Sequence, residues 1–173
     1  MLAPAVRAAG LEGTQVSVTA YCCTAPIESN QLTKTVSATV GGGTEFAAGS
    51  LPNLNPFQPI ITSDIDVSGT QIDLTYTVTA VSGIGTFNGL VFDFAGLGAE
   101  RISGATLNPL SSFLPASVQL GFDTDTVRVS LPGLSFVPGT QVSHRRCAGP
   151  GAGAERMGHA ACRVGSAHPG RTI

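Results

Sequence analysis

Apolar and polar residues alternate one by one along most of this chain, and this period of two restricts the fold more than any other feature. The clearest run is 71–79, where apolar side chains occupy every second position: Ile72, Leu74, Tyr76 and Val78. Such a period is that of a β-strand, whose successive side chains point to opposite faces. No segment between Thr14 and Val142 shows the apolar period of about 3.6 residues of an amphipathic helix. The chain therefore predicts an all-β fold.

Turn-forming residues cut the alternating region into eight to ten short segments. The expected strands are 14–23, 34–40, 44–47, 60–67, 71–81, 87–94, 101–107, 117–122, 126–131 and 134–142. Residues 68–70 and 123–125 predict hairpin turns. Segment 87–94 is apolar on both faces and is expected to be central, and 109–115 is the one stretch expected to form a helical turn. Short strands at this spacing predict an antiparallel β-sandwich of jelly-roll type.

The alternation stops near Ser143, and the chain beyond it is rich in Arg, Gly and Ala without any period. We therefore expect a β-sandwich domain at 13–142 and a disordered basic tail at 143–173. Residues 1–12 would be a flexible N-terminus or the remnant of a signal peptide. Ala3-Pro4-Ala5 has the small-x-small form of a cleavage site, and a plain flexible terminus fits these residues equally.

The charge of the alternating region argues against nucleic acid as a partner. Between residues 11 and 142, ten acidic residues stand against three basic ones, Lys34, Arg101 and Arg128. Nucleic-acid binding depends on neutralising phosphates with Lys and Arg. No apolar run reaches the roughly 18 residues that a membrane-spanning helix needs. We therefore expect no nucleic acid and no membrane span in the chain as given.

Catalysis of the Ser–His–Asp or Cys–His type is not expected. It needs an imidazole beside the nucleophile, and all three histidines (His144, His159 and His168) follow the alternating region. A glycosidase needs two carboxylates in a cleft, and nothing in the sequence marks such a pair. The expectation is a non-enzymatic protein, with a glycosidase-like enzyme as the weaker alternative.

The acidic residues are also the candidate metal ligands. Asp64 and Asp66 share one face of an expected strand, and Asp123 and Asp125 lie in an expected turn. Calcium accepts carboxylate oxygens in variable number, so these four residues are the candidate calcium ligands. The EF-hand loop pattern is absent, and plain turn or surface roles remain the alternative. No other cofactor is expected.

Cys22 and Cys23 are adjacent at the end of the first expected strand. In an oxidising compartment they could form a disulfide. The alternative is one buried and one exposed thiol, because neighbouring residues of a strand point to opposite faces. Past the alternating region, four residues are of zinc-ligand type but follow no zinc-site spacing: Cys147, His159, Cys162 and His168.

Carbohydrate binding is the main alternative function. Sugars stack on exposed aromatic rings, and this chain has no tryptophan, so Tyr21, Tyr76 and Phe57 are the candidate rings. A carbohydrate-binding module, with or without calcium, would place Tyr21 or Tyr76 beside the aspartates on a concave face.

Several stretches follow a pattern found in one group of bacterial surface proteins. They are VSVTAYCC at 16–23, TVGGGTEF at 39–46, DIDV at 64–67, FNGLVF at 87–92, GFD at 121–123 and LPGL at 131–134. With them the region 13–142 resembles the extracellular part of PEP-CTERM proteins, the substrates of exosortase sorting. The resemblance implies a secreted or cell-surface protein associated with exopolysaccharide or extracellular matrix.

Members of that family end in a Val-Pro-Glu-Pro type motif, an apolar membrane helix and an Arg cluster, which this chain lacks as translated. The genetic code suggests a reason. Residues 149–154 (GPGAGA), read one nucleotide later, can encode Val-Pro-Glu-Pro-Ala-Pro, and Met157-Gly158 then forces a tryptophan. We therefore hypothesise that the residues from about Ser143 onward are a frameshifted reading of a sorting tail.

Overall fold

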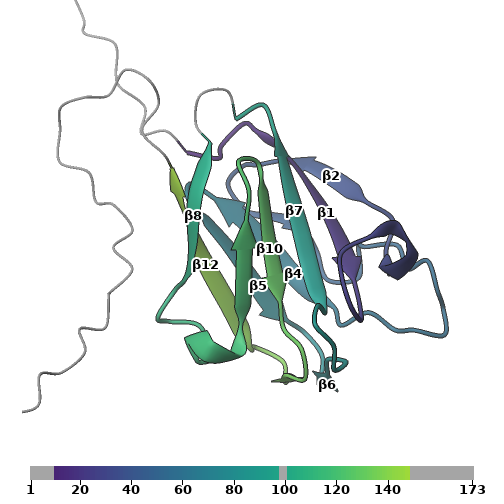
Figure 1. The fold of residues 1–173 in the computed structure, drawn as a ribbon. Coiled ribbons are helices and arrows are strands. Elements are labelled where there is room, and N and C mark those ends of the chain that lie inside the picture. Colours follow the sequence, from purple (N-terminus) through teal and green to yellow (C-terminus); the bar gives the residue numbers. More distant parts are fainter. Residues whose placement is uncertain (1–9, 98–100, 149–173) are drawn as a thin grey trace, which may run out of the picture.

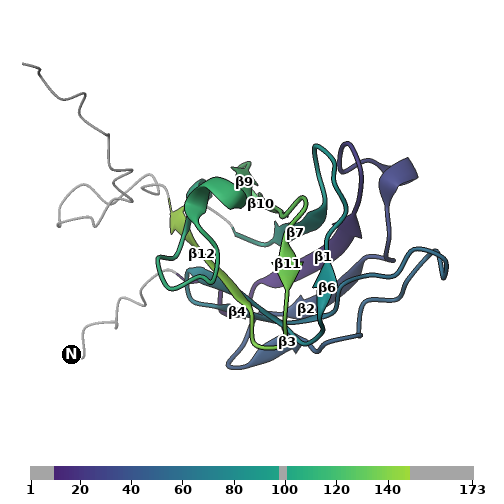
Figure 2. The same ribbon diagram turned by 90° about the horizontal axis from the view of Figure 1, so that it is seen from below.

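The computed structural model describes residues 10–97 and 101–148, which form two antiparallel sheets packed face to face (Figures 1 and 2). This confirms the expected all-β sandwich. Most of the expected N-terminal segment and of the expected tail, 1–9 and 149–173, lies outside the described residues. No helix in the described part of the chain is long and apolar enough to cross a membrane.

The first sheet has the strand order β2–β1–β7–β10–β9. Its strands are β1 (Gln15–Tyr21), β2 (Val36–Thr39), β7 (Gly89–Ala95), β9 (Gln119–Phe122) and β10 (Thr126–Ser130). The strand β7 lies between β1 and β10, as its two apolar faces predict. The expected hairpin at 123–125 is also confirmed, since β9 pairs with β10.

The second sheet has the strand order β3–β4–β5–β12–β8. Its strands are β3 (Thr44–Phe46), β4 (Ser63–Ser68), β5 (Gln71–Tyr76), β8 (Ile102–Leu107) and β12 (Gln141–Ala148). The β4–β5 hairpin turns at the expected place, where Gly69 has a φ of +48°, a conformation that glycine adopts without a steric penalty.

Two expected strands are each split in two. The segment 71–81 divides into β5 and β6 (Ala80–Val81), and 134–142 divides into β11 (Ser135–Phe136) and β12; β6 pairs with β11 at one end of the sandwich (Figure 2). The break between β11 and β12 follows from the turn at Pro138-Gly139. Gly139 has a φ of +86°, which ends the extended backbone. The expected helical turn at 109–115 is wrong: the short 3₁₀ turns are at Glu28–Asn30 and Pro115–Ser117.

The core lies between the two sheets and follows the alternation of the sequence. Every second residue of β4 and of β5 is buried, so their apolar side chains point inward and their polar ones outward. The largest fully buried side chains come from both sheets, from β11 and from the segment before β1: Leu11, Val16, Val18, Ile65, Val67, Ile72, Leu74, Phe92, Val127, Val129, Phe136 and His144. Each such apolar side chain contributes about 1.5–3 kcal/mol of burial free energy.

The end of the sandwich lies later than the sequence predicts. The expected boundary at 142 falls inside β12, which continues through Ala148 and pairs with β5 and with β8. The two-residue period also continues, because Val142, His144 and Arg146 are all buried on the core side. Backbone pairing between strands does not depend on side-chain type, so a polar sequence does not end this strand.

Candidate functional site

The outer face of the second sheet carries a polar groove of about 440 Å³. Its walls combine carboxylate, amide and hydroxyl side chains with one exposed leucine: Thr44, Asp64, Asp66, Gln71, Asp73, Thr75, Asn108, Leu110, Gln141 and Ser143. Apolar and polar residues alternate along β4 and β5. The apolar side chains face the core, so the polar side chains lie on the outer face and line the groove.

Asp66 and Asp73 are directly opposite each other on β4 and β5. Partial burial raises the pKa of the Asp66 carboxyl, and the negative charges of Glu45 and Asp73 raise that pKa further. Its Oδ1 atom is buried and has no hydrogen-bond partner among the described residues. The groove therefore holds a carboxyl group that binds a proton more readily than an ordinary aspartate.

The other acids of this face have local partners. Asp64 Oδ1 accepts from the Ala48 N–H at 2.8 Å, and both oxygens of Asp73 accept from Gln71 Nε2 at 2.9 and 2.7 Å. Glu45 joins the edge strand to its neighbour, since its oxygens accept the N–H groups of Gly41 (2.8 Å) and Val67 (2.6 Å). These carboxylates hold the backbone and side chains that shape the groove.

The four predicted calcium ligands are not brought together. Asp64 and Asp66 are on β4 of the second sheet, whereas Asp123 and Asp125 are in the β9–β10 turn of the first sheet. Within 10–97 and 101–148, no three His, Cys, Asp or Glu residues are grouped so that they could hold a metal ion. Calcium needs six to eight oxygen ligands, which two aspartates on one strand do not supply.

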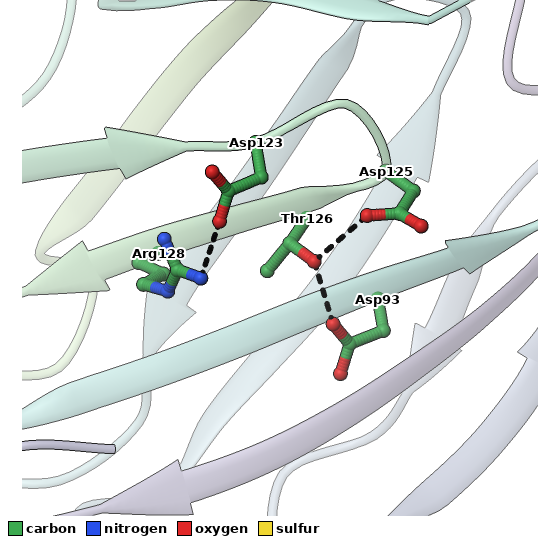
Figure 3. Close-up of polar contacts among 5 residues, drawn as sticks. All are labelled: Asp93, Asp123, Asp125, Thr126 and Arg128. Carbon is green, nitrogen blue, oxygen red and sulfur yellow. Dashed lines mark hydrogen bonds and ion pairs between the residues drawn. The ribbon is translucent and has the colours of Figure 1, made fainter.

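The turn between β9 and β10 uses its acids within the sheet (Figure 3). Asp123 forms an ion pair with Arg128 at 2.5 Å. The hydroxyl of Thr126 lies 2.9 Å from Asp93 Oδ1 and 3.2 Å from Asp125 Oδ1. The acids of this turn therefore have turn and surface roles, the stated alternative to calcium binding.

Cys22 and Cys23 are joined in a disulfide between adjacent residues at the end of β1. Cys22 is buried and Cys23 is exposed, and Cys23 has a φ of +84°, the only positive value among the described non-glycine residues. The side-chain amide of Gln58 donates to Cys22 Sγ at 3.1 Å. Of the zinc-type residues, His159, Cys162 and His168 lie outside the described residues, and Cys147 is part of β12.

The aromatic residues do not form the platform expected of a carbohydrate module. Tyr76 is buried against Phe136, with ring centroids 4.1 Å apart, so it does not line the outer groove. Tyr21 is half-buried, and Phe57 is 94% exposed but belongs to neither sheet. Any sugar binding in the groove would rest on hydrogen bonds from carboxylates and amides.

Sequence reasoning missed two features of this region. Gln71, Asp73, Asn108 and Gln141 join the two aspartates only because β4, β5 and β12 are neighbours in this register. His144 was assigned to the tail, although its place two residues after Val142 in the alternation was a signal for the core.

Comparison with known families, curated proteins and solved structures identifies no match for this chain. Its function must therefore be argued from its own residues.

Proposed function

We propose that this protein is a non-enzymatic, extracytoplasmic β-sandwich that binds polysaccharide through the groove on the outer face of its second sheet. The observation that carries the proposal is the gathering of carboxylate, amide and hydroxyl groups over β4, β5 and β12. Sugar hydroxyls both donate and accept hydrogen bonds, and such a surface offers both kinds of partner. This is the polar surface that an association with exopolysaccharide requires.

Some groups of the groove are free for a ligand. Gln141 is exposed, and its side-chain amide makes no hydrogen bond to another described residue. Asp66 Oδ1 also has no partner among them. A bound sugar would restore these hydrogen bonds, so binding would not have to break existing contacts.

The disulfide supports an extracytoplasmic location. Disulfides persist in oxidising compartments and are rare in the cytosol, where thiol systems keep cysteines reduced. The composition of the chain is consistent with this location. The outer faces carry many Ser, Thr and Gln side chains, and charged residues form 12% of the chain.

Affinity electrophoresis in gels containing soluble polysaccharides, followed by a glycan array, tests the proposal. We expect Gln141→Ala to weaken binding about 3- to 10-fold, the effect of one neutral hydrogen bond. Gln119→Ala is the matched control, because Gln119 is an exposed glutamine of the first sheet. Equal effects of the two variants, or no retardation by any glycan, would overturn the groove as the binding site. Release of reducing ends from the bound glycan would show an enzyme instead.

The sorting-tail hypothesis gains support from β12. His144 is fully buried, and neither of its ring nitrogens has a hydrogen-bond partner among the described residues, which is unfavourable for a natural core position. Histidine is encoded by CAY, and the next codon, for Arg145, begins with C or A. Read one nucleotide later, position 144 therefore becomes Ile or Thr, both β-branched residues that favour strands.

The gene's nucleotide sequence across the codons of β12 tests this hypothesis. We expect the shifted frame to continue the strand with apolar residues and then to read Pro-Glu-Pro, an apolar run and an Arg cluster. A shifted frame with an early stop codon or without an apolar run would refute it. Most of the groove does not depend on this result, because β4, β5 and Gln141 all come before the break.

A further inference from the structure

A second hollow lies at the end of the sandwich near the β6–β11 pair. It is a cavity of about 250 Å³ between the sheets, separate from the outer groove. Its lining is mostly apolar and comes from both sheets and from the loop before β4, including Ala20, Leu51, Ile61, Leu90, Leu131 and Phe136. None of its lining residues carries a charge. A charged molecule would lose its hydration there without compensation, so an occupant must be neutral.

Two residues on the cavity wall have hydroxyl groups that make no hydrogen bond within the described part of the chain. Ser63 and Tyr76 are paired opposite each other on β4 and β5, and both line the cavity. Both residues are more than nine-tenths buried, and neither hydroxyl makes a hydrogen bond to another described residue. Burial raises the pKa of the Tyr76 phenol, so this group stays protonated and can donate. An acceptor bound in the cavity would give both hydroxyl groups a hydrogen-bond partner.

The other polar side chains of the cavity are already used within the fold. Ser82 donates to the carbonyl of Leu131, and the Asn88 amide donates to the carbonyl of Gly83 at 3.1 Å. Gln58 Nε2 donates to Cys22 Sγ at 3.1 Å. Tyr76 and Ser63 thus carry the hydroxyl groups of the cavity wall that make no hydrogen bond within the described residues. A carbonyl oxygen has two lone pairs and can accept from both hydroxyls at once.

The apolar walls of the cavity suit an aromatic ring. The rings of Tyr76 and Phe136 both line the cavity, and the disulfide of Cys22 and Cys23 adds two polarisable sulfur atoms to its wall. Val81 and Ile84 stand at the rim with 68% and 93% of their surface exposed, which gives the entrance an apolar edge.

From these features we propose that the cavity is a binding site for a small, neutral aromatic carbonyl compound, whose oxygen accepts hydrogen bonds from Tyr76 and Ser63. The volume agrees with this class. It exceeds the roughly 150 Å³ of a cavity that holds benzene and falls below the roughly 300 Å³ at which drug-sized sites begin. This site is distinct from the polysaccharide groove, and neither proposal depends on the other.

Fluorine NMR with two probes of the same shape tests the site. 4-Fluoroacetophenone carries the carbonyl oxygen, and 4-fluoro-α-methylstyrene replaces it with a CH₂ group. We expect the wild-type protein to bind the ketone about 3- to 10-fold more tightly, as one or two hydrogen bonds allow. In Tyr76→Phe, which keeps the ring, and in Ser63→Ala, this preference should shrink. In Tyr21→Phe it should persist, because Tyr21 is the other tyrosine and does not line the cavity.

A second pair of variants locates the site. Val81→Trp places a bulky ring at the rim and should weaken binding of both probes, whereas Val137→Trp should not, because Val137 is 57% exposed but lies outside the cavity. Equal affinity for the two probes in the wild-type protein, absence of binding, or the same loss of preference in Tyr21→Phe as in Tyr76→Phe would overturn the proposal.

Discussion

The imidazole of His144 on β12 faces the ring of Phe92 on β7 across the interface between the two sheets, with ring centroids 6.1 Å apart. Both side chains are fully buried, and Phe92 is among the largest of the fully buried side chains. A polar ring that has no hydrogen-bond partner within residues 10–97 and 101–148 therefore lies in the middle of an apolar core. The stability of this protein depends on that contact in ways that can be measured.

Replacing His144 with leucine should stabilise the protein at pH 7.5. The substitution removes two buried nitrogens without partners and fills a similar volume with apolar atoms. We expect the free energy of unfolding, from urea denaturation, to rise by about 1–3 kcal/mol. His144→Gln is the control, because it keeps a buried amide and should not stabilise. A leucine variant less stable than the wild type would show that the imidazole is better accommodated than its contacts indicate.

Acid should weaken the fold through the same residue. Burial lowers the pKa of His144 to about 4, while the charge of Asp73 acts in the opposite direction. Between pH 6.5 and 4 the unfolded state binds a proton on this histidine that the folded state does not, so stability falls as the pH falls. The lowered pKa of His144 corresponds to a decrease of about 3 kcal/mol in the free energy of unfolding between pH 6.5 and 4. Urea unfolding at several pH values should show this slope in the wild type and a shallower one in His144→Leu.

Glu45→Gln should have two separable effects. One of the N–H groups of Gly41 and Val67 would lose its acceptor, so the free energy of unfolding should fall by about 1–2 kcal/mol. Removing the negative charge should also lower the pKa of Asp66, because Glu45 is one of the causes that raise it. NMR titration of the Asp66 carboxyl measures the second effect. Glu28→Gln serves as the control, since Glu28 is exposed in a 3₁₀ turn.

Two glycines of the first sheet should respond differently to alanine. A methyl group at Gly89 would collide with the backbone carbonyl of Val129 and lie 2.9 Å from the Ser130 Cα. We expect Gly89→Ala to lower the free energy of unfolding by about 1–3 kcal/mol. At Gly121 the nearest atom is Arg128 Cβ at 3.7 Å, an ordinary contact, so Gly121→Ala should leave stability unchanged or raise it by up to about 1 kcal/mol. Similar thermal midpoints for the two variants would contradict this account of the β7–β10 contact.

The candidate groove was only partly predictable. Asp64 and Asp66 were correctly placed on one face of a strand, because that follows from the two-residue period alone. Asp123 and Asp125 lie in the other sheet, which could not be foreseen because the sequence does not say which strands share a sheet. Gln141 is far from β5 in the sequence, and only the pairing of β5 with β12 places it opposite Thr75 in the groove.

The sequence by itself determined the local structure of this protein: its strands, its two hairpins and the inward and outward faces of β4 and β5. Those features depend on neighbouring residues, so the alternation and the turns were enough to predict them. Only the tertiary structure decided the order of the strands, the separation of the acidic pairs, the end of the sandwich at Ala148 and the burial of His144. These depend on contacts between distant segments, where backbone hydrogen bonding extends a strand whatever side chains it carries and packing against the opposite sheet decides what is buried.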